Sequence, residues 1–259
     1  MVEVTFAESF IKVEDDLVCG IFGNQALGNV DPRFGSAEDV AANRLKALAA
    51  LLGEQAAASS ANSCLSVMKP AGKQGFVDLS EIADLAHIPP TDGLITTNPN
   101  ICLSGNPADC AMLAIYGFGA HRRPVLGLIH VGRRIASEGG HRKALAYLAD
   151  RHGLEPQNAH LIVSPAIHGA SYKLHHLSQP YTTDPSWAKY VYQDDDDLWH
   201  VDFHTKIIDE LQNAGVPMEQ TYVSPDDTGS GDKYFSHCQF RQNKQPIAGR
   251  NAVIFRLQN

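Results

Sequence analysis

Short apolar runs separated by glycine and proline restrict the fold of this chain more than any other feature of its sequence. They lie at residues 63–68, 92–96, 100–104, 110–117, 124–131 and 159–164, and a last one covers 252–255. Apolar runs of roughly four to eight residues bounded by turn residues are typical of buried β-strands. The predicted strands outnumber the predicted helices, so the sequence indicates a fold with a large β component.

Apolar residues keep the spacing of an α-helix in three other segments. These segments are 37–52, 134–150 and 201–214. Ser36 and Asp39 can cap the start of the first helix, and Gly53 ends it. Residues 168–199 follow no regular pattern and predict a long surface excursion. No hinge-like linker divides the chain, so we expect a single mixed α/β domain over residues 1–259.

The composition excludes several classes of partner. Of 259 residues, 44% are hydrophobic and 19% are charged, which is typical of a globular chain with a large core. The 21 basic and 29 acidic residues give a formal net charge of −8, so we expect no nucleic-acid partner and no binding to an anionic membrane. No apolar stretch approaches the roughly 18 residues of a membrane helix.

Cysteine usage bears on the compartment. The chain has five cysteines, an odd number, and no CxxC pair. The N-terminus also lacks the charged and then apolar pattern of a signal peptide. Thiols in such a chain are typical of a reducing compartment, so we expect a cytoplasmic protein.

One cysteine and one histidine stand at the ends of neighbouring predicted strands. Cys110 opens the run at 110–117, and His130 lies near the end of the run at 124–131. Side chains so placed can meet at one edge of a sheet, either as a nucleophile pair or as two ligands of zinc or copper. The alternative is that Cys110 is a buried apolar residue and His130 a hydrogen-bonded core residue. The pattern alone leaves both open.

Two other groups of polar residues have weaker signals. His200 and His204 are four apart at the start of the predicted helix 201–214, a spacing used by zinc sites, but without the glutamate of HExxH. The acidic run at 194–197 lacks the spaced glycine and distal glutamate of a calcium loop. We expect a solvated helix start and a solvated acidic turn, respectively.

Several short motifs occur in a characteristic order along the chain. They are Asn43-Arg44, Thr91-Asp92-Gly93-Leu94-Ile95-Thr96, Pro107-Ala108-Asp109-Cys110, His130-Val131-Gly132-Arg133-Arg134, Ser164-Pro165-Ala166-Ile167, Tyr234-Phe235-Ser236 and Gly249-Arg250. Together they resemble the landmarks of the YfiH-like laccase-domain family, whose members are described as polyphenol oxidoreductases and as purine nucleoside phosphorylases. The resemblance implies a four-layer α/β/β/α fold with central β layers flanked by helices.

The resemblance also implies a metal site. In that family one metal ion lies between three side chains, two of which correspond to Cys110 and His130, while Lys69 stands where the third ligand, a histidine, is expected. A protonated lysine about 4 Å from a divalent ion would be repelled by roughly 8 kcal/mol at an effective dielectric of about 20. Three outcomes remain open: His87 supplies the third ligand, Lys69 binds as a neutral amine, or no metal is bound and Lys69 with Arg133 stabilises a Cys110 thiolate beside His130.

The activity that the resemblance implies is attack on purine nucleosides. It comprises phosphorolysis of the glycosidic bond and deamination of adenosine, with zinc or copper, or no metal, at Cys110 and His130. Arg134 and Arg44 would hold phosphate, unless they form ordinary surface ion pairs, and Asp109 would orient its loop. The alternatives are a copper-dependent polyphenol oxidase, a metal-free Cys–His hydrolase and an inactive ligand-binding relative. The oxidase is disfavoured because multiple His-x-His pairs are absent from the sequence.

Overall fold

Two six-stranded β-sheets form the centre of the fold in the computed structural model, which describes residues 1–72, 75–82 and 85–258. In spatial order the first sheet holds β1 (Glu3–Phe6), β2 (Phe10–Glu14), β3 (Val18–Gly23), β15 (Val253–Leu257), β7 (Cys102–Gly105) and β4 (Leu65–Val67). The second holds β14 (Thr221–Val223), β10 (His160–Val163), β8 (Ala111–Phe118), β9 (Pro124–Val131), β6 (Gly93–Thr96) and β5 (Phe76–Asp78). A small third sheet consists of β11 (Lys173–Leu174), β13 (Trp199–Val201) and β12 (Val191–Gln193).

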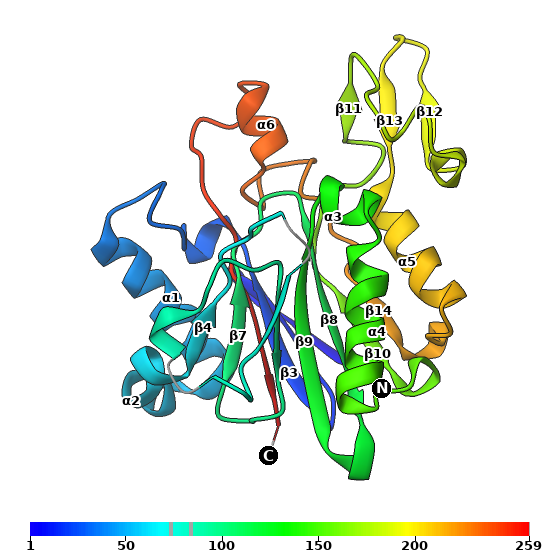
Figure 1. The fold of residues 1–259 in the computed structure, drawn as a ribbon. Coiled ribbons are helices and arrows are strands. Elements are labelled where there is room, and N and C mark those ends of the chain that lie inside the picture. The colour runs from blue at the N-terminus through cyan, green and yellow to red at the C-terminus, as the bar shows by residue number, and fades with distance from the viewer. Residues whose placement is uncertain (73–74, 83–84, 259) are drawn as a thin grey trace.

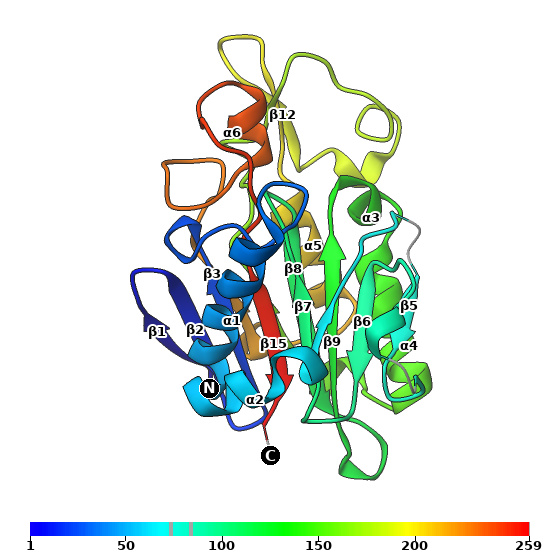
Figure 2. The same ribbon diagram turned by 90° about the vertical axis from the view of Figure 1, so that its left-hand side faces the viewer.

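Helices cover the outer faces of both large sheets. The α-helices of the described residues are α1 (Ala37–Leu52), α2 (Glu54–Cys64), α3 (Arg133–Ser137), α4 (Gly140–His152), α5 (Phe203–Asn213) and α6 (His237–Arg241). Figure 1 shows α1 and α2 on one side of the sheets and α4 and α5 on the other. The four-layer α/β/β/α arrangement implied by the family resemblance is therefore confirmed. Figure 2, turned by 90°, shows α6 and the loops around it beyond one end of the strands.

Strand β8 shows why the central strands are apolar throughout. Leu113 and Ile115 are buried in the core between the second sheet and its helices. Met112, Ala114 and Tyr116, which alternate with them, are buried in the core between the two sheets. Because successive side chains of a strand point to opposite faces, a strand buried on both faces needs an uninterrupted apolar run. Full burial of each large side chain stabilises the fold by about 1.5–3 kcal/mol.

The helix expected at 37–52 forms with the expected cap. The Asp39 N–H donates to Ser36 Oγ at 3.0 Å, and Gly53 closes the helix in a conformation with φ of 83°. The helix expected at 134–150 is instead two helices, α3 and α4. They are separated at Gly139, which adopts a left-handed φ of 68° that glycine permits without steric cost.

Other parts of the sequence fold differently from expectation. Strands β1 to β3, β5 and β14 and helices α2 and α6 were not expected, and the excursion at 168–199 contains β11 and β12, the two edge strands of the small third sheet. Residues 63–68 are strand only over β4, because α2 continues to Cys64. Among the described residues, no helix has the length and apolar character needed to span a membrane.

The expectation that His200 and His204 lie at a solvated helix start is wrong, because both residues are buried. His200 lies on β13, and Asp202 caps α5 by accepting the Thr205 N–H, so His204 alone is helical. The two ring nitrogens of His200 are 2.7 Å from the Gly169 carbonyl oxygen and 2.9 Å from Asp194 Oδ2. Asp194 also accepts N–H groups from its own turn, so the acidic run at 194–197 forms a solvated turn as expected.

Candidate functional site

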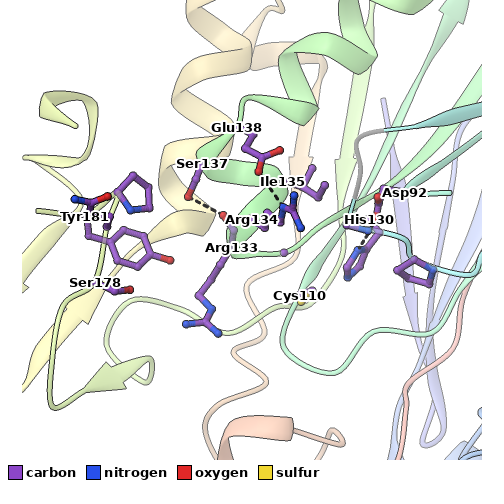
Figure 3. Close-up of a pocket in the computed structure, with 15 residues that line it drawn as sticks. Asp92, Cys110, His130, Arg133, Arg134, Ile135, Ser137, Glu138, Ser178 and Tyr181 are labelled. Atoms are coloured by element: carbon purple, nitrogen blue, oxygen red, sulfur yellow. Dashed lines mark hydrogen bonds and ion pairs between the residues drawn. The ribbon is translucent and has the colours of Figure 1, made fainter. Parts of the chain in front are cut away.

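A cavity of about 730 Å³ opens at the end of the second sheet where β8 begins and β9 ends. Met112 of β8 pairs with His130 of β9, and this antiparallel register brings Cys110, just before β8, next to the His130 turn. The expected meeting of Cys110 and His130 is thus observed (Figure 3). The lining residues are Pro70, Gly72, Asp92, Cys110, His130, Gly132, Arg133, Arg134, Ile135, Ser137, Glu138, Ser178, Gln179, Pro180 and Tyr181.

Gly132 allows this close approach of the sulfur and the imidazole. A Cβ atom added at Gly132 would lie 3.0 Å from Cys110 Sγ and 3.8 Å from His130 Nε2. A distance of 3.0 Å is too short for a carbon and a sulfur in van der Waals contact, so any side chain here would push Cys110 away. The glycine of the His-Val-Gly segment therefore keeps space for the sulfur beside the ring.

Asp92 lies on the other side of the His130 ring. Its carboxylate side chain is only 1% exposed, and its Oδ1 is 3.6 Å from His130 Nδ1. The same oxygen accepts the Gly72 N–H at 3.0 Å, and the His130 N–H donates to the Asp92 carbonyl oxygen at 2.9 Å. The backbone of Asp92 thus holds the backbone of His130, and its carboxylate lies at ion-pair distance from the ring.

The surroundings of His130 favour its protonated form. Burial alone would lower the pKa of His130, but the Cys110 sulfur and the Asp92 carboxylate together outweigh burial and raise the pKa to about 9. His130 is therefore charged near neutral pH. A sulfur, an imidazole and a carboxylate in this order can orient a proton donor, and they can also activate a thiol nucleophile.

The donor set does not fit a catalytic metal of the usual kind. Cys110 and His130 offer two ligands, whereas a catalytic zinc takes three protein ligands. In the described ranges, no group of three or more His, Cys, Asp or Glu side chains is placed to hold a metal ion. His87 and Lys69 are both exposed, and neither lines the cavity, although Pro70 does. We therefore derive no chemical step through a metal.

The two arginines expected to hold phosphate have different environments. Arg134 lines the cavity, but its Nε donates to Glu138 Oε1 at 2.9 Å, one turn along α3. Arg44 does not line the cavity; its Nε donates to the Val30 carbonyl oxygen at 3.0 Å. Arg133, which follows Gly132, projects to the other side of α3 from Arg134 (Figure 3).

Asp109 holds the loop that carries Cys110. Its carboxylate accepts the Thr228 hydroxyl at 2.9 Å and the Cys238 N–H at 2.7 Å. Its backbone has a φ of 78°, a left-handed conformation that aspartate tolerates better than most residues. These contacts agree with the orienting role expected for Asp109 and tie the Cys110 loop to α6.

Comparison with known proteins settles the family. The family described as multi-copper polyphenol oxidoreductase laccase matches residues 29–258. The chain belongs to this family. No curated protein matches the sequence. Among solved structures, YlmD from Geobacillus stearothermophilus has a TM-score of 0.78 at 18% identity over 98% of both chains. The Bacillus licheniformis protein YfiH has a TM-score of 0.73 at 19% identity over 97% of both chains. At these identities the likeness shows the fold alone.

Some lining residues of this laccase-family chain were not assigned from the sequence. Asp92 was recognised as part of a motif but not as the partner of His130. The sequence signal for this partnership was that Asp92 directly precedes β6, the strand that pairs with the strand of His130. Ser178 and Tyr181 come from the segment expected to be a surface excursion. No sequence pattern connects that segment with the Cys110 loop.

Proposed function

We propose that this chain is an enzyme that cleaves purine nucleosides by phosphorolysis at the Cys110–His130 site. The reaction class comes from the family resemblance. The observation that supports it in this chain is that His130 lies between the Cys110 sulfur and the Asp92 carboxylate, which keep it protonated in an open cavity. Cleavage of a nucleoside needs such an acid, because the purine leaves more easily when it is protonated.

The proposed reaction uses groups present in the chain. A phosphate oxygen forms a bond to C1′ of the ribose, and the bond from C1′ to the purine nitrogen breaks. The electron pair of that bond goes to the purine, which takes the proton of His130. The phosphate then returns one proton to His130, and the products are the free base and ribose 1-phosphate. Asp92 stabilises the charged imidazole before the transfer, and Cys110 orients it.

The test is product analysis with inosine and adenosine, in the presence and absence of phosphate. The expected result is free base and ribose 1-phosphate formed only with phosphate, and a large loss of rate in His130→Ala and Cys110→Ser. His121→Ala, which changes an exposed histidine outside the cavity lining, is the matched control. No release from either nucleoside, also with added zinc, would contradict the proposal. Deamination of adenosine at the same centre stays a prediction. It is tested by measuring the inosine formed from adenosine in the same samples.

A second candidate is a thiol-dependent hydrolase. The observation that favours it is the order Cys110, His130, Asp92, which matches the nucleophile, base and orienting carboxylate of covalent catalysis. In that reaction Sγ would attack the carbonyl carbon of an ester or amide, and the bond from that carbon to the alcohol or amine would break as the leaving group takes a proton from His130. Water would then hydrolyse the thioester, which releases the carboxylic acid and restores the thiol. Sensitivity of Cys110 to iodoacetamide, in protein that releases no base from nucleosides, would favour this reading.

Two further attributes belong with the proposal. Oxidation of polyphenols, named in the family description, has less support, because the described residues contain no histidine-rich metal cluster. A cytoplasmic location is supported by the five cysteines, all of which are free thiols in the structure.

A further inference from the structure

A second cavity, of about 380 Å³, lies beside the main one and shares Cys110 and Arg133 with it. Its remaining walls come from α6, the start of α5 and the segments around Ile167 and Tyr172. Asp109 holds α6 to the Cys110 loop through the Cys238 N–H, so this cavity is built into the fold rather than left between loosely connected segments.

The charges on this cavity are predominantly positive. Arg133 and Arg241 both line it, and neither forms an ion pair with a carboxylate in the described part of the chain. Several other arginines do form such pairs: Arg33, Arg134, Arg142 and Arg151. Asp109 also lines the cavity, but its carboxylate already accepts hydrogen bonds from Thr228 and Cys238.

Apolar and aromatic side chains share the lining of this cavity with Arg133 and Arg241, which are both exposed residues. Ile167 and Phe203 are fully buried, and the Tyr172 and Phe203 rings meet edge to face with centroids 6.0 Å apart. The guanidinium carbon of Arg133 lies 5.7 Å from the centroid of the Tyr172 ring, within the range of a cation–π interaction. Apolar walls around like charges focus the electric field and strengthen the attraction of an anion.

We propose that Arg133 and Arg241 form a phosphate-binding subsite next to Cys110. This inference rests on the proposed function, and it makes Arg133, rather than the Glu138-paired Arg134, the principal anion-binding residue. A guanidinium group binds phosphate oxygens through two parallel N–H donors, and one phosphate carries enough charge to balance both arginines. The phosphate comes either from orthophosphate as the second substrate or from a phosphate ester on the nucleoside.

The experiment is calorimetric titration of the full chain with orthophosphate, inosine and inosine 5′-monophosphate. The variants Arg133→Met and Arg241→Met remove each charge but keep an apolar side chain of similar length. Arg151→Met, on the exposed face of α4 and paired with Glu81, is the matched control. Thermal unfolding of each variant shows whether the fold is retained.

The proposal predicts that each of the two variants weakens binding of the phosphate compounds by about tenfold or more and leaves inosine binding unchanged. Binding of the monophosphate much tighter than inosine identifies the ester as the source. If orthophosphate binding depends on the two arginines and the monophosphate binds no more tightly than inosine, the phosphate of this subsite is free orthophosphate. If Arg133→Met and Arg241→Met both fold and both bind orthophosphate and the monophosphate as tightly as the wild type, the proposed subsite is refuted. Absence of turnover in the wild type would refute the proposed function while leaving these binding results readable.

Discussion

Substitution of Asp109 tests how the Cys110 loop is held in place. The carboxylate accepts two hydrogen bonds, from Thr228 and Cys238, while only 9% of the residue is exposed. Hydrogen bonds to a charged group contribute about 1.5–3 kcal/mol each, and a buried N–H left without an acceptor is costly. Asp109→Ala should therefore lower the free energy of unfolding by about 3–5 kcal/mol, with up to about 1 kcal/mol more from the left-handed backbone.

Two matched variants separate these contributions. Asp109→Asn keeps the shape, tolerates a φ of 78° and can still bond both partners as a neutral group, so we expect a loss of only about 1–2 kcal/mol. Asp109→Gly loses both hydrogen bonds but relieves the backbone, and it should be slightly less damaging than Asp109→Ala. Urea unfolding followed by circular dichroism gives all three values. Equal losses in the alanine and asparagine variants would refute the reasoning.

Two further predictions concern the site and the response to pH. Gly132→Ala should lower the catalytic rate strongly and the stability little, because the added methyl group displaces Cys110 Sγ. Gly75→Ala is the control in the same rate assay, since a carbon added there has open space around it. A Gly132→Ala variant as fast as the Gly75→Ala control would contradict this prediction. Burial lowers the pKa of His141 and His204 to about 4, so as the pH falls from 6.5 towards 4 the unfolded chain takes up protons that the folded chain does not. Stability should fall in that window by up to about 3 kcal/mol per histidine, and urea unfolding across these pH values that showed no change would refute this.

The central strands and the Cys110–His130 pair could be predicted because both depend on local pattern. Apolar runs identified β6 to β10, and the antiparallel pairing of β8 with β9 brings the end of one beside the start of the other. The pairing of Arg134 with Glu138 was also available, since residues four apart are neighbours on a helix.

The unpredicted elements lack such local signals. Gly20 and Gly23 weaken the strand pattern of the 18–23 segment, and β3 pairs on one side with β15, which is distant in sequence. Helix α2 is rich in alanine and serine and has no clear apolar stripe, so its periodicity is faint. The shared position of Arg133 between two cavities depends on α6 and Tyr172, which are far away in sequence. Tertiary packing alone decides these features.

The most direct test of the account is phosphorolysis of inosine by protein stripped of metal with a chelator, with zinc and copper per chain measured on the same sample. The proposed chemistry takes place on Cys110, His130 and Asp92, and no group of three His, Cys, Asp or Glu side chains in the described residues is placed to hold a metal ion. It predicts that the stripped protein releases ribose 1-phosphate at the rate of the untreated protein. Loss of that activity on stripping, and its return with one equivalent of zinc or copper per chain, would contradict it.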